Sequence, residues 1–161
     1  MHKSSSKEQQ MAEEEILKQL FSDQNWCMDN FCINESISLG KNVSVCICPD
    51  FYSEKDGIIG EIHSHVGKLK PSQAHKISAD ILKMLLFEKV RHIKLRKMLV
   101  VCSEDEAAQL SGNSHLGEAI RQFGIELVCV HVQQDTYDRL VLAQKRQKNG
   151  KCMSIIEEIP L

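Results

Sequence analysis

PDFYSEKDGIIGEIHSH, residues 49–65, is the stretch that decides the fold of this 161-residue chain. Two runs rich in β-branched and aromatic residues flank the turn signal EKDG, a pattern typical of an antiparallel hairpin. The residues before it are also rich in strand formers and are divided by Gly40. We therefore predict three antiparallel strands, over residues 31–39, 41–53 and 57–67.

The register of the second hairpin determines which polar side chains meet. A turn centred on residues 55–56 places Asp50 opposite Glu61, and a turn at residues 56–57 places Asp50 opposite His63. Because side chains alternate along a strand, both registers put Asp50, Glu61 and His63 on the same face of the sheet. The sequence leaves the choice of register open.

The remaining chain alternates helical and apolar patterns. Helical spacing predicts a first helix over residues 11–22, a long helix from a Ser72 cap to about Val90, and a third region over residues 104–123 that is interrupted at 111–113. Buried strands are predicted over residues 97–102 and 125–132, and a last helix from about Asp135, whereas residues 148–161 show no firm periodicity. Helices between the later strands imply crossovers. We expect an α/β fold of order αβββαβαβα, with a mixed central sheet and helices on both faces.

Composition favours one ordinary globular domain. The chain is 42% apolar and 26% charged, so we expect a flexible tail over residues 1–10 and a single domain over residues 11–161. The formal net charge of −2 gives no global attraction to nucleic acid or to anionic lipid. No apolar run is long enough for a secretory signal or a membrane span, so we expect a cytoplasmic protein that does not bind membranes.

Seven cysteines occur in the chain, several of them in apolar segments. We expect reduced, mostly buried thiols. Four of them could form a zinc site only at spacings that are not typical of zinc fingers: Cys27, Cys32, Cys46 and Cys48.

The acids of the hairpin indicate a metal site. Opposed carboxylates repel each other unless a proton or a cation lies between them, so Asp50 and Glu61 point to a hard divalent ion such as Mg²⁺ or Mn²⁺. The alternative is that Asp50 is a polar residue near a turn and Glu61 an exposed strand residue.

Pro49 and Asp50, followed after ten residues by Glu61, Ile62 and His63, resemble the core motif of the PD-(D/E)xK nuclease-like superfamily. The predicted order of elements over residues 11–133 is also similar to that restriction-endonuclease-like fold. The resemblance implies a divergent metal-dependent nuclease, an endonuclease-like hydrolase of phosphodiester bonds. Nucleic acid would then be its partner, with DNA favoured over RNA.

Carried over by position, the resemblance makes Asp50 and Glu61 metal ligands and gives His63 the catalytic position of the family's lysine. A neutral imidazole can accept a proton from water but supplies no fixed positive charge for a phosphate. Lysines near the start of the long helix could supply that charge, with Lys76 preferred: Lys68, Lys70 and Lys76. An acid of the first helix often approaches the metal in this superfamily, which makes Glu13 a third candidate ligand, with Glu14 and Glu15 as alternatives.

One local cluster of cations could contact phosphates. It lies in KVRHIKLRK, residues 89–97, and comprises Lys89, Arg91, Lys94, Arg96 and Lys97. The alternative is a solvated helix end whose cations complement the helix dipole.

Two other functions stay open. A catalytically inactive binding or assembly module on a nuclease fold, acting as a homodimer or with a protein partner, fits the histidine in the motif. The pattern His63-x-His65 with Ser72 is similar to zinc isopeptidases of the JAB/MPN type. However, the gap to Ser72 is one residue short, and His75 stands where that family has an aspartate.

Overall fold

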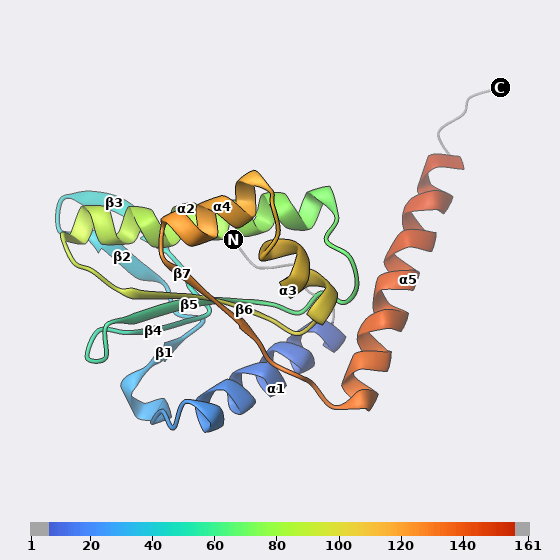
Figure 1. Ribbon diagram of the computed structural model, residues 1–161, viewed down its shortest axis with the longest axis horizontal. Helices are drawn as coiled ribbons and strands as arrows, with labels where there is room; N and C mark the ends of the chain where they lie inside the picture. Colours follow the sequence, from blue (N-terminus) through green and yellow to red (C-terminus); the bar gives the residue numbers. More distant parts are fainter. Residues whose placement is uncertain (1–6, 157–161) are drawn as a thin grey trace.

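The structure, a computed structural model, describes residues 7–156, and the side chains of residues 7–148. Its centre is a five-stranded sheet of order β1-β4-β5-β6-β7 (Figure 1). The strands are β1 (Cys32–Ile33), β4 (Phe51–Ser53), β5 (Ile58–His63), β6 (Arg96–Val101) and β7 (Ile125–Cys129). Strands β1, β4 and β5 pair antiparallel, and β5, β6 and β7 pair parallel, which confirms the predicted mixed sheet.

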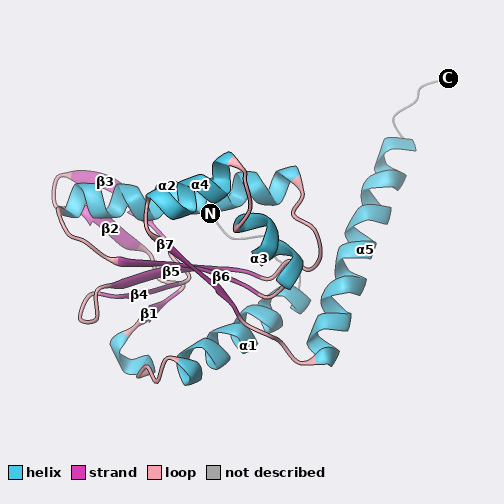
Figure 2. Cartoon of the chain, viewed as in Figure 1, coloured by secondary structure: helices cyan, strands magenta, loops and turns pink. Residues whose placement is uncertain are grey.

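Helices cover both faces of the sheet, as predicted (Figure 2). They are α1 (Lys7–Asp23), α2 (Pro71–Arg91), α3 (Glu104–Leu110), α4 (His115–Gln122) and α5 (Gln134–Ile156). One apolar cluster joins the sheet to α2, α3 and α4, and a second joins it to α1 and α5. Ile77, Ile81 and Met84 of α2 are buried at the helical spacing that aligns side chains on one face, which confirms the predicted long helix.

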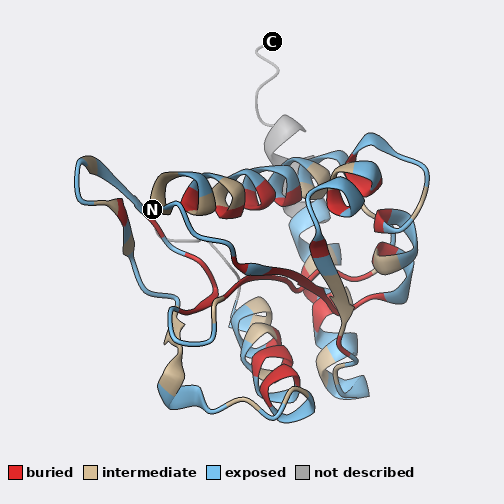
Figure 3. Cartoon of the chain, turned by 60° about the vertical axis from the view of Figure 1, so that its left-hand side comes forward, coloured by how far each residue is buried: buried red, intermediate tan, exposed pale blue. Residues whose placement is uncertain are grey.

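The central strands are enclosed from both sides, and Figure 3 shows buried residues running through the middle of the sheet. All six residues of β5 are buried. Ile58 and Ile62 face the cluster of α1, whereas Ile59 faces the cluster of α2. Glu61 and His63 continue the alternation on the α2 side, so the polar residues of β5 lie between the sheet and α2.

One close contact fixes the register of β4 against β5. Phe51 lies opposite Gly60, Tyr52 opposite Ile59 and Ser53 opposite Ile58. A Cβ atom on Gly60 would lie only 1.9 Å from Cζ of Phe51, so the ring of Phe51 fills the space that a side chain at this position would need. This register confirms the turn centred on residues 55–56, because it continues to Asp50 opposite Glu61.

The predicted first and second strands are each broken in two. Residues 37–47 form a separate antiparallel ribbon, β2 (Ile37–Gly40) with β3 (Val43–Ile47), outside the main sheet. Asn34, with a φ of 53°, turns the chain between β1 and β2. Pro49, which has no amide hydrogen to donate, lies between β3 and β4. The expected single strands over residues 31–39 and 41–53 are therefore wrong.

Several boundaries also differ from expectation. Helix α1 begins at Lys7, so residues 7–10 are helical, and residues 1–6 of the predicted tail lie outside the described residues. Lys70, and not Ser72, occupies the cap of α2, because Pro71 is favoured in the first helical turn. Helix α5 continues to Ile156, through residues without clear periodicity.

The thiols are not mostly buried. Of the cysteines with described side chains, only Cys102 is buried, while Cys27, Cys46 and Cys48 are exposed. Among the described residues, no helix combines the length and the apolar character needed to cross a membrane.

The contact between Phe51 and Gly60 gives a test of the register. We expect Gly60→Ala to lower the free energy of unfolding by about 1–3 kcal/mol, the usual cost of overpacking a core. Urea denaturation measures this. Phe51→Leu removes the ring and should make the added methyl group less costly, so the double variant should lose less than the sum of the two single variants. Strictly additive losses would contradict the contact.

Candidate functional site

The side chain of Asp50 continues the hydrogen bonding between β4 and β5 beyond their last backbone pair. The amide of Ile62 on β5 donates to Asp50 Oδ2 at 2.7 Å, and the amide of Asn34 donates to the Asp50 carbonyl at 3.0 Å. The carboxylate thus accepts from an amide of β5 that lies beyond the last backbone pair of β4 and β5, Phe51 with Gly60. Asp50 is thereby held beside β5, at the position opposite Glu61.

Glu61 points from the middle of β5 to α2. Its Oε1 atom lies 2.7 Å from Nζ of Lys83, and the same ammonium group lies 3.0 Å from Oδ1 of Asp80. Asp80 and Lys83 are three residues apart in α2, so both reach the sheet side of the helix. The result is an acid of the sheet and an acid of the helix that share one lysine.

His63 completes a continuous chain of polar contacts. Its Nε2 atom lies 3.1 Å from Oδ2 of Asp80. The order of contacts is His63, Asp80, Lys83 and Glu61, with Asp50 beside Glu61. His63 therefore contacts an acid of α2, and Lys83 of the same helix contacts Glu61.

The electrostatics of this cluster are strained at Glu61. Burial raises the pKa of Glu61 well above its ordinary value, and the negative charges of Asp50 and Asp80 raise it further, against the opposing effect of Lys83. Burial would also raise the pKa of Asp80, but the hydrogen bond from His63 and the charge of Lys83 outweigh it and lower that pKa. For Lys83, burial lowers the pKa, but Glu61 and Asp80 raise it overall. The charged form of Lys83 is therefore favoured, whereas the charged form of Glu61 is disfavoured.

Lys83 is not among the lysines that the sequence suggests. The preferred Lys76 is exposed on α2. A signal for the correct region exists, because Asp80 lies three residues after Ile77 and four before Met84, within the apolar stripe of the helix. An acid at such a position must find a partner, and a lysine three residues later provides one.

Glu13, the third predicted metal ligand, has a side-chain contact with Ser64. Glu13 of α1 accepts a hydrogen bond from Oγ of Ser64 at 3.3 Å. Glu14 is exposed, and Glu15 binds the start of α5 through the amide of Gln133. Within the part of the chain whose side chains are described, no three His, Cys, Asp or Glu side chains are arranged to hold a metal ion.

Two carboxylates are nevertheless a donor set that suits Mg²⁺. This ion commonly binds one or two carboxylates and keeps several waters. Asp50 and Glu61 provide that number and type of ligand, and the raised pKa of Glu61 indicates a position that favours a neutralising cation or a proton. Asp50 and Glu61 would therefore be the residues that hold the ion.

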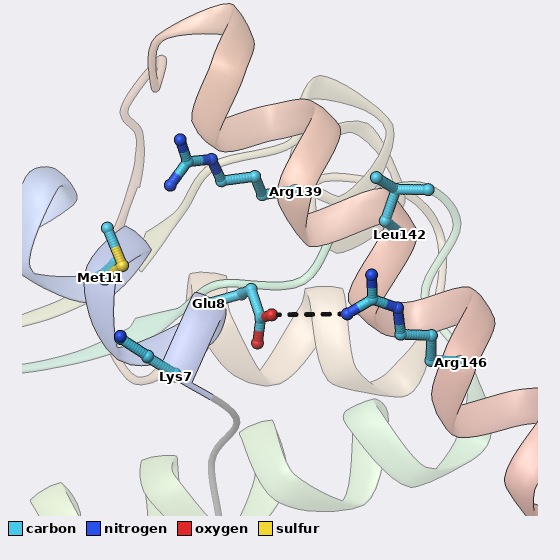
Figure 4. A pocket seen from close by; sticks show the side chains of 6 residues that line it. All are labelled: Lys7, Glu8, Met11, Arg139, Leu142 and Arg146. Carbon is cyan, nitrogen blue, oxygen red and sulfur yellow. Dashed lines mark ion pairs between the residues drawn. The ribbon is translucent and has the colours of Figure 1, made fainter.

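The acids are enclosed. Asp50 is 3% exposed, Glu61 0% and His63 2%. A surface hollow of about 380 Å³ lies elsewhere, between α1 and α5 (Figure 4). It is lined by Lys7, Glu8, Met11, Arg139, Leu142 and Arg146, and an ion pair of 3.8 Å joins Glu8 to Arg146 across it. Lys83, whose side chain is 22% exposed, is the most exposed member of the cluster.

The two histidines of the isopeptidase-like pattern have separate partners. His63 contacts Asp80, whereas His65 lies 3.3 Å from Glu106 of α3, in a second buried pair. Ser72 and His75 are exposed in the first turns of α2. The structure does not bring these four residues together around a common point.

The predicted cation cluster is largely engaged within the protein. Lys97 is buried and lies 2.8 Å from Glu88, and Arg96 pairs with Glu126. Arg91 donates to the carbonyls of Ser38 and Leu39 and so ties the β2–β3 ribbon to α2. Lys89 and Lys94 are exposed. Only part of the predicted patch is available to a phosphate, and Lys97 has a structural role instead.

The strain at Glu61 predicts an unusual effect on stability. When folding raises the pKa of a carboxyl group, the protein loses stability as the pH rises from the pKa of that group in the unfolded state to its pKa in the folded state. Glu61→Gln should therefore raise the melting temperature at pH 8, with a gain that shrinks as the pH falls toward 4.5.

Glu126→Gln is the matched control, because the hydrogen bond from Arg96 lowers the pKa of Glu126 and its replacement should not stabilise the protein. Thermal melts between pH 4 and pH 8 measure both variants. A lower melting temperature of Glu61→Gln at pH 8 would mean that Glu61 serves a stabilising ion pair.

Comparison of the chain with protein-family models, with curated proteins and with solved structures finds no match. The chemistry of this site is therefore inferred from its own residues.

Proposed function

We propose that this protein is a divergent metal-dependent nuclease that hydrolyses phosphodiester bonds in nucleic acid, with DNA as the expected substrate and the cytoplasm as its location. The observation that supports this is that two buried acids, Asp50 just before β4 and Glu61 in β5, lie opposite each other, and that Lys83 of α2 contacts Glu61. Glu61 lies in the core at an electrostatic cost, which burial, Asp50 and Asp80 together impose. Such tension is common at functional sites, where charge is arranged for chemistry and not for stability.

The residues have distinct roles in this proposal. Asp50 and Glu61 would hold Mg²⁺ or Mn²⁺, which supplies charge stabilisation at the phosphate under attack. Lys83 provides the fixed positive charge that His63 lacks. Asp80 Oδ1 pairs with the Lys83 ammonium group at 3.0 Å, and His63 contacts the other carboxylate oxygen of Asp80. His63 is thus a positioning residue, in place of the catalytic role expected from its position in the motif.

A second function is favoured by the burial of the acids. An inactive binding module on the same fold would use Lys83 only to neutralise Glu61, and would need no opening to solvent. The enclosed carboxyls of Asp50 and Glu61 fit this interpretation. Metal binding and cleavage distinguish the two functions.

The metal site predicts binding of Mn²⁺ to the parent protein. Isothermal titration calorimetry should detect one ion per chain, and Asp50→Asn and Glu61→Gln should each weaken its binding at least about tenfold, because each removes a charged ligand. Asp29→Asn, which neutralises an acid of the 3₁₀ turn (Met28–Asn30), is the control. If the parent binds no ion, or if both site variants bind it as well as the parent, Asp50 and Glu61 form no metal site.

The nuclease proposal predicts that cleavage depends on Lys83. Lys83→Met should lower the rate of Mg²⁺-dependent cleavage of plasmid and single-stranded DNA by about 100-fold or more, the scale of losing a polar group that acts in the transition state. Lys18→Met removes an exposed lysine of α1, which lies on the other face of the sheet, and should leave the rate unchanged. His63→Ala removes the support of Asp80 and should lower the rate less than Lys83→Met, and His63→Gln, which can still hydrogen-bond to Asp80, should restore part of it.

Two results would contradict the proposal. A parent protein that cleaves no nucleic acid with Mg²⁺ or Mn²⁺ would favour the binding module. Cleavage that is indifferent to Lys83→Met would assign the positive charge to another residue.

A further inference from the structure

The charge of this protein is distributed unevenly along the chain. Residues 68–94, which comprise α2 and its flanking loops, contain seven lysines and arginines but only two acids, in a chain whose formal net charge is −2. The rest of the chain is correspondingly acidic. Such asymmetry in a nearly neutral protein indicates a local electrostatic surface.

Both acids of this segment are directed inward. Asp80 is buried and pairs with Lys83, and Glu88 pairs with the buried Lys97 at 2.8 Å. The Glu88 carboxylate also accepts a hydrogen bond from the amide of Leu95 at 2.7 Å. The side of α2 that faces away from the sheet therefore presents cations without intervening carboxylates of its own.

Five lysines of the segment are available to a ligand. Four are exposed and one, Lys70, is half-buried; none of them forms an ion pair with any residue whose side chain is described: Lys68, Lys70, Lys76, Lys89 and Lys94. Helix α2 has 21 residues. At a rise of 1.5 Å per residue it spans about 30 Å, close to one turn of duplex DNA.

Two of these lysines, Lys76 and Lys89, lie in the helix that also contributes Lys83 to the acid cluster, and the other three lie in its flanking loops. The inner side of α2 packs on β2 and β5, so its outer side faces solvent (Figure 1). Lys83 itself points to the acids on the sheet side and is not part of this outer surface.

We propose that the outer side of α2, from Lys68 to Lys94, is the surface that binds the phosphate backbone of nucleic acid. This inference rests on the proposed function for the identity of the polyanion. It replaces the cluster over residues 89–97 predicted from the sequence, of which only Lys89 and Lys94 belong to this surface.

Two exposed leucines lie among these cations, Leu82 and Leu86, which are one helical turn apart. An acidic amphipathic helix of a partner protein could use the same features, since leucines and lysines alternate around such a contact. The spread of the lysines favours a phosphate backbone, because they extend into both flanking loops, beyond the two leucines, and no carboxylate of the segment pairs with them.

Fluorescence anisotropy with labelled 20-nucleotide DNA, 20-nucleotide RNA and a 20-base-pair DNA duplex tests the surface, in EDTA so that no cleavage takes place. The variant changes all five lysines to glutamine. Its control changes five exposed lysines elsewhere, so that the net charge is the same: Lys18, Lys41, Lys55, Lys145 and Lys148.

We expect the parent and the control to bind at least one of the three probes. The α2 variant should bind that probe at least about tenfold more weakly, and its dependence of log K on log salt should be less steep by about 0.7–0.9 for each phosphate that the variant no longer neutralises. Equal losses in the α2 variant and the control would show non-specific attraction and overturn the proposal. No binding of any probe by the parent would also overturn it, and binding of an acidic helical peptide instead would assign the surface to a protein partner.

Because EDTA removes the metal, the test is independent of catalysis. Binding through α2 by a parent that cleaves nothing would overturn the nuclease and leave this surface in place. Cleavage by a parent whose α2 variant binds and cleaves normally would leave the nuclease and remove the surface.

Discussion

The ring of Phe51 occupies the space where any other residue at position 60 would carry its side chain, and this contact governs the centre of the molecule. It admits one alignment of β4 on β5, in which Phe51 lies opposite Gly60. A shift of one residue would turn Glu61 to the face of α1 and bring Ile62 to the face of α2. The position of every polar group between the sheet and α2 therefore depends on this pair of residues.

That alignment buries the Glu61 carboxylate near other acids, and Lys83 of α2 only partly offsets the resulting repulsion. Glu61 is carried into a buried layer next to Asp50, and an isolated charge there would be very costly. Lys83 approaches from α2 at 2.7 Å and compensates, but Asp80 holds the same lysine. One ammonium group thus serves two carboxylates, and His63 supports the second of them. The members are coupled, so a change at one of them alters the charge balance of the others.

The sequence predicts which side chains share a strand face, because side chains alternate along a strand. It does not predict which helix residues reach that face, because this depends on how the helix packs. The shared face of Asp50, Glu61 and His63 follows from a period of two, which holds in either register of the hairpin. The choice of lysine requires the rotation of α2 against the sheet, and no local pattern around Lys83 distinguishes it from Lys76 without that rotation. Asp80, an acid inside an apolar stripe, is the only local sign of the buried network.

Other differences have equally specific causes. The predicted strand over residues 41–53 is broken near Pro49, which cannot donate to a ladder. The separated β2–β3 ribbon is held to α2 by Arg91 and by the burial of Leu39 and Ile47. Lys97 alternates with Met98 on β6, so the strand directs it toward α2 and Glu88 and away from solvent. A count of cations along the sequence cannot separate such a lysine from Lys89 or Lys94, because burial is decided by the partner element.

The carboxylate of Glu15 in α1 links the first described helix of the protein to the last one. It accepts hydrogen bonds from the amide of Gln133 and from the hydroxyl of Thr136, at the start of α5. The first turn of a helix has amide groups without partners inside the helix, and here a residue from the opposite end of the chain satisfies one of the amides at that end of α5. Helix α5 therefore has this support only while α1 is docked beside it, so each of these two helices helps to hold the other in place.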